Sequence, residues 1–512
     1  MTNISKDRRQ PRRTEIATAR DNKRVSAARR FDSKAAINLA CILGFFLVLE
    51  GFLPLRSAVQ IGADEGFELA KATLCLKGHR LYSEVWDDQP PLHTFLITQT
   101  FKDISLSILG PRLITICFAS VLLSSMFVIC SRLSGLPQAV LTTVLLMASP
   151  GFLALGGSCM LEIPALAPVL AALAVIASGS APIAWSRITM AGALFGAALS
   201  MKLIPVILIP IAAFMIWSHD RSGRGTGLLA MKALLLLGLS AGVSFAIIDI
   251  FVDRGAFLTH FGQTWVSHFA KAKSLEYGSP QDHPFEWIVL LRNWDVTVPA
   301  LLGVAFALRQ VRKGFVALLP IAWLGLMFCI FTIHRPWWSY YYVHMAIPLC
   351  WCAAIGLIEV WNRLNSWGRW RMLPIAPCVV LIGWMSARVY LEIRSVRESA
   401  RIYSSPVIGL MKRFKPFTQW LYTEEPVYSF HCGIPLPPDL GVVMLKRFWS
   451  GEMTNDKINA ELMAVEPGMI LLSTDTNLRP YSALIAAQYR MVYQDPAHRL
   501  YVHNSIADKV DL

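Results

Sequence analysis

The chain has 512 residues, of which 54% are hydrophobic and only 16% carry a charged side chain. An average soluble domain has about 25% charged residues, so this composition excludes an ordinary soluble globular protein and indicates an integral membrane protein. The net charge of +14 is concentrated at the N-terminus, where residues 1–34 hold eleven Lys or Arg and four Asp or Glu. We predict that this basic segment is disordered and cytoplasmic. A nucleic-acid-binding arm is the less favoured alternative, and no nucleic-acid partner is expected.

Eleven apolar stretches approach the roughly 20 residues that a helix needs to cross a bilayer. The connections that face the cytoplasm, if the N-terminus is inside, contain Lys or Arg, as the positive-inside rule requires. We therefore predict an α-helical polytopic protein of the cell (inner) membrane, with a transmembrane domain at 35–398. The expected spans are 35–55, 108–131, 137–157, 161–178, 187–201, 203–218, 228–251, 294–309, 314–333, 341–361 and 372–391.

An odd number of spans places three segments outside the cell: the loops 56–107 and 252–293, and the tail from 399 to 512. The tail alternates short apolar runs with helical patterns, which predicts a small extracytoplasmic α/β domain. We expect strands at 426–430, 469–473, 490–494 and 499–503, and helices at 455–465 and 480–488.

The first outer loop contains many acidic, basic and histidine residues, with the sequence DEGFELAKATLCLKGHRLYSEVWDDQPPLHTFL at 64–96. Its apolar spacing predicts a helix from Asp64 to Gly78 lying along the membrane surface, with its first acids at the end that favours carboxylates. A second amphipathic piece is expected from His93 to Lys102. Asp87 and Asp88 are interpreted as solvated turn acids before the Pro-Pro break.

This loop resembles that of the polyprenyl-phosphate-dependent membrane glycosyltransferases of the C-type fold. The family includes protein O-mannosyltransferases and the aminoarabinose transferases that modify lipid A. The resemblance continues in MLEIPALAPVLAALA (160–174), GALFGAALSMKLIPVILIP (192–210) and HRPWWSYYYVHMAIPL (334–349). Matching features of the loop follow in the family's order: Asp64-Glu65, Gly78, Tyr82, Pro90-Pro91-Leu92 and Arg112-Leu113.

The resemblance implies transfer of a sugar from a polyprenyl monophosphate to a glycan, lipid or protein acceptor. An acceptor hydroxyl is a poor nucleophile, so a carboxylate must take its proton, and by resemblance Asp64 is this general base. Glu65 is expected to orient the base or the acceptor. Glu162, which stands where relatives often have aspartate, is expected to close the site.

The leaving phosphate of such a donor needs cations where its negative charge develops. Lys202, Arg335 and His344 lie at predicted outer helix ends, where cations can stabilise the leaving phosphate. Tyr341 is expected to donate a hydrogen bond or stack on the sugar. Gln89 stands where several relatives place a lysine, so its contact with the phosphate is a departure from the pattern.

Two alternatives to an enzyme remain at the level of sequence. A lipid or solute transporter would also be polytopic, but it would usually show internal repeats and paired broken helices, which this sequence lacks. A glycan-binding scaffold would not need Glu162 and Lys202 next to the membrane. The spacing of His260, His268 and His283 matches no standard metal site, so neither a metal nor another cofactor is expected.

Overall fold

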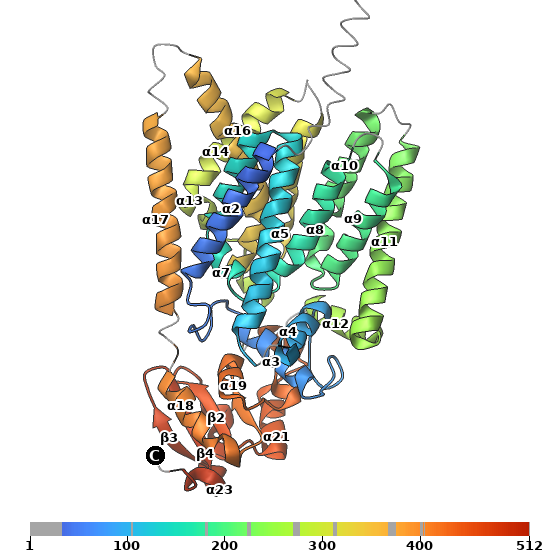
Figure 1. The fold of residues 1–512 in the computed structure, drawn as a ribbon. Coiled ribbons are helices and arrows are strands. Elements are labelled where there is room, and N and C mark those ends of the chain that lie inside the picture. The colour runs from blue at the N-terminus through green and yellow to red at the C-terminus, as the bar shows by residue number, and fades with distance from the viewer. Residues whose placement is uncertain are drawn as a thin grey trace, which may run out of the picture.

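The computed structural model describes residues 33–103, 106–179, 183–222, 227–269, 277–310, 315–366, 375–399, 403 and 405–510. Residues 1–32 of the basic segment therefore lie outside the described residues, and Ser33 and Lys34 begin a helix. Figure 1 shows a bundle of long helices with a small mixed domain, drawn in orange and red, packed at one end of it. The fold class expected from the sequence is confirmed, since an apolar helical bundle is followed by a small C-terminal sheet.

The bundle is built from apolar helices that share one large buried core. Five of the described helices are long and apolar enough to cross a membrane: Ser33–Gly51, Leu109–Leu133, Leu228–Asp253, Val316–Ile333 and Ser339–Asn365. The total of eleven crossings stays a prediction. The helices are α2 (Ser33–Gly51), α5 (Leu109–Leu133), α6 (Leu136–Met147), α7 (Phe152–Gly156), α8 (Glu162–Ala177), α9 (Trp185–Leu199), η1 (Ile204–Leu208), α10 (Ile209–Ser222), α11 (Leu228–Asp253), α14 (Trp294–Gln310), η4 (Phe315–Leu318), α15 (Leu319–Ile333), η5 (Ser339–Tyr341), α16 (Tyr342–Asn365) and α17 (Ile375–Ser399).

One expected span differs from the structure. The stretch 137–157 is two helices, because α6 ends at Met147 and α7 begins only at Phe152. The break contains Pro150 followed by Gly151, whose φ of +76° is a left-handed conformation that favours glycine. Hydropathy alone does not distinguish such a break from a continuous helix.

Two glycines of α9 allow it to pack directly on α11. A Cβ atom at Gly192 would lie 2.5 Å from the carbonyl oxygen of Leu237, and one at Gly196 would lie 2.4 Å from that of Ala241. Small residues spaced by four let membrane helices approach closely without a hydrophobic driving force. The glycine-rich sequence of this helix therefore serves packing, and it fixes the position of Lys202 just beyond the end of α9.

The first loop forms the two expected helices, α3 (Glu65–Leu76) and α4 (Leu92–Asp103). Both the polar and the apolar residues of α3 are buried, and its position at the membrane surface stays a prediction. Its neighbour on the far side is α19 (Pro426–Cys432) of the C-terminal domain, and a Cβ atom at Gly66 would lie 2.8 Å from the backbone nitrogen of Val427. Helix α3 thus lies between the bundle and the C-terminal domain (Figure 1).

The second loop contains α12 (Ala256–Phe269), η2 (Pro280–Asp282) and α13 (Ile288–Arg292). The C-terminal domain has a four-stranded sheet in the order β1-β2-β4-β3, with β1 and β2 parallel and the other pairs antiparallel. Its elements are α18 (Ser405–Phe414), η7 (Lys415–Phe417), β1 (Leu421–Thr423), α19, η8 (Pro438–Leu440), α20 (Leu445–Ser450), α21 (Asn455–Val465), β2 (Met469–Ser473), η9 (Arg479–Tyr481), α22 (Ser482–Gln488), β3 (Tyr489–Gln494), β4 (His498–His503) and α23 (Asn504–Ala507).

The sequence predicts three of the four strands in this domain. The expected strand at 426–430 is wrong, because this segment is helix α19, and the strand lies just before it at Leu421–Thr423. Pro426 occupies the first helical turn and Gly433, with φ of +66°, ends the helix. This placement of proline and glycine is a helix signal that outweighs the short apolar run between them.

Candidate active site

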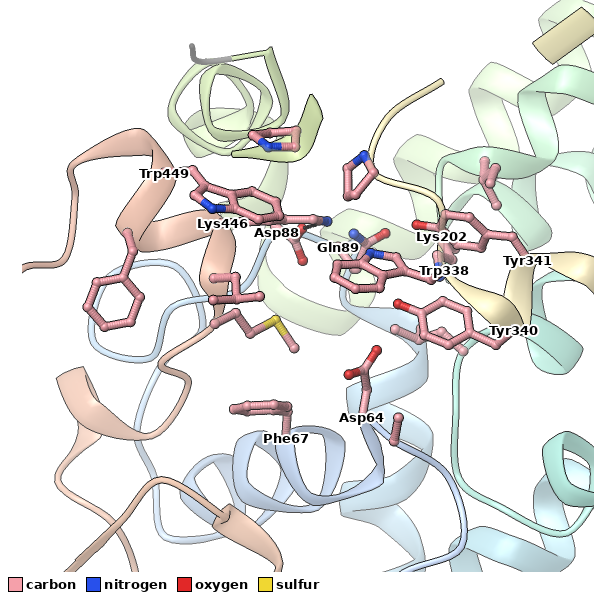
Figure 2. Close-up of a pocket in the computed structure, with 18 of the residues that line it drawn as sticks. Asp64, Phe67, Asp88, Gln89, Lys202, Trp338, Tyr340, Tyr341, Lys446 and Trp449 are labelled. Carbon is pink, nitrogen blue, oxygen red and sulfur yellow. Dashed lines mark hydrogen bonds and ion pairs between the residues drawn. The ribbon is translucent and has the colours of Figure 1, made fainter. Parts of the chain in front are cut away.

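A cavity of about 750 Å³ opens between the end of the helical bundle and the C-terminal domain. Figure 2 shows that its walls come from α3, the loop before α4, the start of η1, η5 and α20. Apolar residues from the start of η1 and the end of α15 form part of its lining: Leu203, Ile204, Val206, Ile207, Ile330 and Phe331. The C-terminal domain contributes aromatic residues and one acid, among them Tyr422, Glu424, Phe448, Trp449 and Tyr481.

Asp64 lies at the start of α3 and points into the cavity (Figure 2). It is the N-cap residue, but its side chain does not bond to the helix backbone, so the carboxylate remains available to the cavity. The Tyr340 hydroxyl donates a hydrogen bond to it. Burial, followed by the nearby charge of Glu162, raises the pKa of Asp64, although Lys202 opposes this shift. A raised pKa makes the carboxylate a stronger base.

Lys202 lies across the cavity from Asp64 and forms an ion pair with Glu162, the first residue of α8. Its ammonium lies 5.7 Å from the ring centre of Tyr340 and 5.5 Å from that of Tyr341. Glu162 is 1% exposed and does not line the cavity itself. The pair therefore holds a lysine, close to two aromatic rings, at a fixed point on the cavity wall.

Glu65 lies next to Asp64 in sequence but faces away from the cavity, and it is fully buried. Arg112 donates two hydrogen bonds of 2.8 Å to its two carboxylate oxygens. The backbone nitrogens of Ile61 and Cys159 donate further bonds of 2.7 and 3.1 Å. Burial opposes the ionisation of Glu65, but the charge of Arg112 outweighs it and lowers the pKa. Glu65 thus fastens the first turn of α3 to two segments of the bundle.

A second buried network stiffens the loop. Lys71 forms ion pairs of 2.9 Å with Glu68 and 3.0 Å with Asp87, and His93 lies 3.2 Å from Glu68. Asp87 also accepts a bond of 3.1 Å from the backbone nitrogen of Gln89. Burial opposes the ionisation of Glu68, but Lys71 and His93 outweigh it and lower the pKa. The interpretation of Asp87 as a solvated turn acid is therefore wrong.

The remaining donor-binding candidates fall into two groups, those that line the cavity and one that does not. Gln89, Arg335 and Tyr341 line the cavity together with Asp64 and Lys202. Arg335 is exposed and donates a bond of 3.2 Å to the carbonyl oxygen of Gln281. His344 does not reach the cavity.

His344 is 2% exposed and packs between the rings of Phe331 and Tyr341, at 5.6 and 6.3 Å. Neither of its ring nitrogens has a hydrogen-bond partner within the described part of the chain. Among these residues, no three His, Cys, Asp or Glu side chains gather closely enough to hold a metal ion.

Sequence reasoning missed the contribution of the C-terminal domain. Lys446 of α20 reaches into the cavity and forms an ion pair of 2.6 Å with Asp88. Asp88 is 4% exposed, so it is not the solvated turn acid that the sequence suggests. Trp449, on the same short helix, also lines the cavity (Figure 2). A basic and aromatic run (MLKRFW, 444–449) is the one signal in the sequence, and it has no specific motif.

The fold is that of the C-type membrane glycosyltransferases (GT-C). ArnT from Cupriavidus metallidurans in the apo state superimposes with a TM-score of 0.63 at 16% identity, over 92% of this chain and 98% of that chain. The oligosaccharyltransferase AglB from Archaeoglobus fulgidus, in complex with an inhibitory peptide and a dolichol-phosphate, gives a TM-score of 0.53 at 11% identity, over 92% and 74%. No family model and no curated protein matches the sequence.

Proposed function

We propose that this protein is a glycosyltransferase that moves a sugar from a polyprenyl monophosphate carrier to an acceptor on the extracytoplasmic face of the inner membrane. The composition of the cavity lining carries the proposal. The apolar residues of η1 and α15 suit an isoprenoid chain, and the same cavity holds a carboxylate, Asp64, opposite a cation, Lys202. A lipid-linked sugar needs this combination of apolar and charged surfaces.

The geometry supports a direct displacement in which Asp64 is the general base. The acceptor oxygen attacks the anomeric carbon, the bond from that carbon to the phosphate oxygen breaks, and Asp64 takes the acceptor proton. The leaving group gains negative charge as it becomes a phosphate monoester. Lys202, with Arg335 at the rim of the cavity, stabilises this charge. Tyr340 donates a hydrogen bond to Asp64 and so orients the base.

The other candidates act by position. Glu162 holds Lys202, and Glu65 anchors the turn that carries Asp64. The rings of Tyr341 and Trp338 line the cavity and offer a surface on which a sugar can stack, and Gln89, beside Trp338, is a neutral donor of hydrogen bonds. The acceptor is a glycan, a lipid such as lipid A, or a protein of the envelope.

The GT-C fold favours this proposal over a lipid or solute transporter. The proposed function is tested by deleting the gene and then analysing the envelope lipids, glycans and proteins by mass spectrometry. One glycosylated species should disappear, and the intact gene should restore it while a gene carrying Asp64→Asn should not. An unchanged envelope, or full restoration by the variant, would contradict the proposal.

The extracytoplasmic location of the site makes a separate prediction about topology. The connections after predicted spans 2 and 10 are basic, and the positive-inside rule assigns them to the cytoplasm. Reporter fusions after Ser134 and Ser366 should therefore be active only as cytoplasmic enzymes, and a fusion after Leu512 only as an external one. Cytoplasmic activity of the C-terminal reporter would place the C-terminal domain, and with it the cavity, in the cytoplasm and would contradict the predicted topology.

A further inference from the structure

Two lysines, from different domains, face the centre of the cavity, and each is held by one buried acid. Lys202, which follows α9 of the bundle, pairs with Glu162, and Lys446, on α20 of the C-terminal domain, pairs with Asp88 at 2.6 Å. Figure 2 shows the lysines on separate walls, with Gln89 between them. Tyr341 lines the same cavity, and its ring centre lies 5.5 Å from the ammonium of Lys202.

The arrangement leaves each ammonium able to bind a further anion. An ammonium has three N–H donors, and the described contacts of each lysine to an acid use one of them. The paired acids keep both lysines charged and fixed in direction. Because a sugar donor leaves behind a phosphate with increased negative charge, two converging ammoniums suit this leaving group better than one.

Docking of the C-terminal domain does not require Lys446 to lie in the cavity. Arg447 of α20 and Glu452, just beyond this helix, already contact the first loop outside the cavity. There the Trp86 indole donates a bond of 2.9 Å to Glu452, and the Arg447 guanidinium lies 5.5 Å from the centre of a Trp86 ring. Lys446 is the residue of this helix whose charge points at the centre instead.

We propose that Lys446 binds the phosphate of the polyprenyl carrier together with Lys202, so that the C-terminal domain completes the donor site. The inference rests on the proposed function, because it assumes a lipid phosphate as the ligand. It makes the C-terminal domain part of the catalytic centre rather than a cover over it, and it assigns the phosphate contact to a residue far along the chain from the first loop.

Binding to the purified full chain tests the proposal with two probes, a polyprenyl monophosphate and the corresponding polyprenol. Lys446→Gln keeps a hydrogen bond to Asp88 but removes the positive charge. It should weaken binding of the monophosphate about tenfold to a hundredfold, as expected for loss of a charged hydrogen bond, and leave polyprenol binding unchanged. Lys446→Arg should keep most of the preference for the monophosphate.

Two further variants separate phosphate binding from docking. Glu452→Ala removes the contacts with Trp86 and Arg447 outside the cavity, and it should leave the ratio of the two affinities unchanged. Asp88→Asn removes a negative charge beside the ligand, and it should shift the ratio several-fold toward the monophosphate. If the ion pair between Lys446 and Asp88 is purely structural, neither Lys446→Gln nor Asp88→Asn should change the ratio of the two affinities.

The outcomes distinguish this inference from the proposed function. A parent protein that binds both probes equally well would contradict the proposed function itself. A parent that prefers the monophosphate, with the same preference in Lys446→Gln and in Asp88→Asn, would overturn only the role of Lys446.

Discussion

Replacing Asp64 with asparagine is expected to slow sugar transfer by about 10²–10⁴-fold, the usual contribution of a general base. Asparagine has the size of aspartate and can accept the hydrogen bond from Tyr340, but it cannot take a proton from the acceptor. Donor binding should stay within a few-fold of the parent, because the lysines that face the cavity are unchanged. The measurement is the single-turnover rate with saturating donor, compared with the equilibrium affinity for the donor.

The dependence of this rate on pH is a second test of the role of Asp64. The base works only when it has lost its proton, and burial beside Glu162 raises the pKa of Asp64. The rate of the parent should therefore fall with decreasing pH at a higher pH than an ordinary aspartate would cause, and Asp64→Asn should lack this step. Glu84→Gln is the matched control, because Glu84 lies in the same loop with a side chain that is 50% exposed. A parent-like rate in Asp64→Asn would assign the base to another group, with Glu162 the first to test.

Replacing Glu65 with glutamine is expected to destabilise the protein by roughly 3–5 kcal/mol, because it leaves the buried Arg112 without its counter-charge. Both carboxylate oxygens of Glu65 accept bonds of 2.8 Å from this arginine, and both side chains are inaccessible to solvent. The unfolding midpoint of the purified protein in detergent should fall clearly. Asp64→Asn, one residue away but facing the cavity, should leave the midpoint almost unchanged.

The kinetics of the Glu65→Gln variant decide between an anchoring and a chemical role. If Glu65 only anchors the turn, the transfer rate of the folded fraction of the variant should still fall with decreasing pH, as it does in the parent. Loss of this fall in rate, with an unchanged unfolding midpoint, would show that Glu65 takes part in proton transfer, contrary to its position outside the cavity.

The apolar helices of the bundle could be predicted from the sequence because hydropathy reports the solvent that surrounds a membrane helix. Details set by local backbone chemistry were less accessible, as the break at Pro150-Gly151 and the helix at 426–432 illustrate. The contact of α3 with the C-terminal domain could not be predicted, because it depends on α19, which lies more than 340 residues further along the chain. The apolar spacing of α3 alone describes a helix with one buried and one solvated face.

The candidate site divides in the same way. Asp64 is indicated by the order of residues that the first loop shares with the C-type glycosyltransferases, and Lys202 by being a lone charge between apolar segments. The orientation of Glu65 away from the cavity depends on Arg112 and could not be inferred from the residues next to Glu65 in the sequence. Asp88 looks like a turn acid until Lys446, from a different domain, is placed 2.6 Å from it. Contacts between distant segments need the fold before they can be seen.

The most direct test of the central claim is the fate of the donor when the purified protein in lipid vesicles is given a polyprenyl monophosphate carrying a radiolabelled sugar and an envelope extract as acceptor. We predict that label appears in an acceptor, with one polyprenyl monophosphate released for each sugar transferred, and that Asp64→Asn largely abolishes both. Passage of the intact donor across the vesicle membrane, with no polyprenyl monophosphate formed, would contradict glycosyl transfer and identify a transporter.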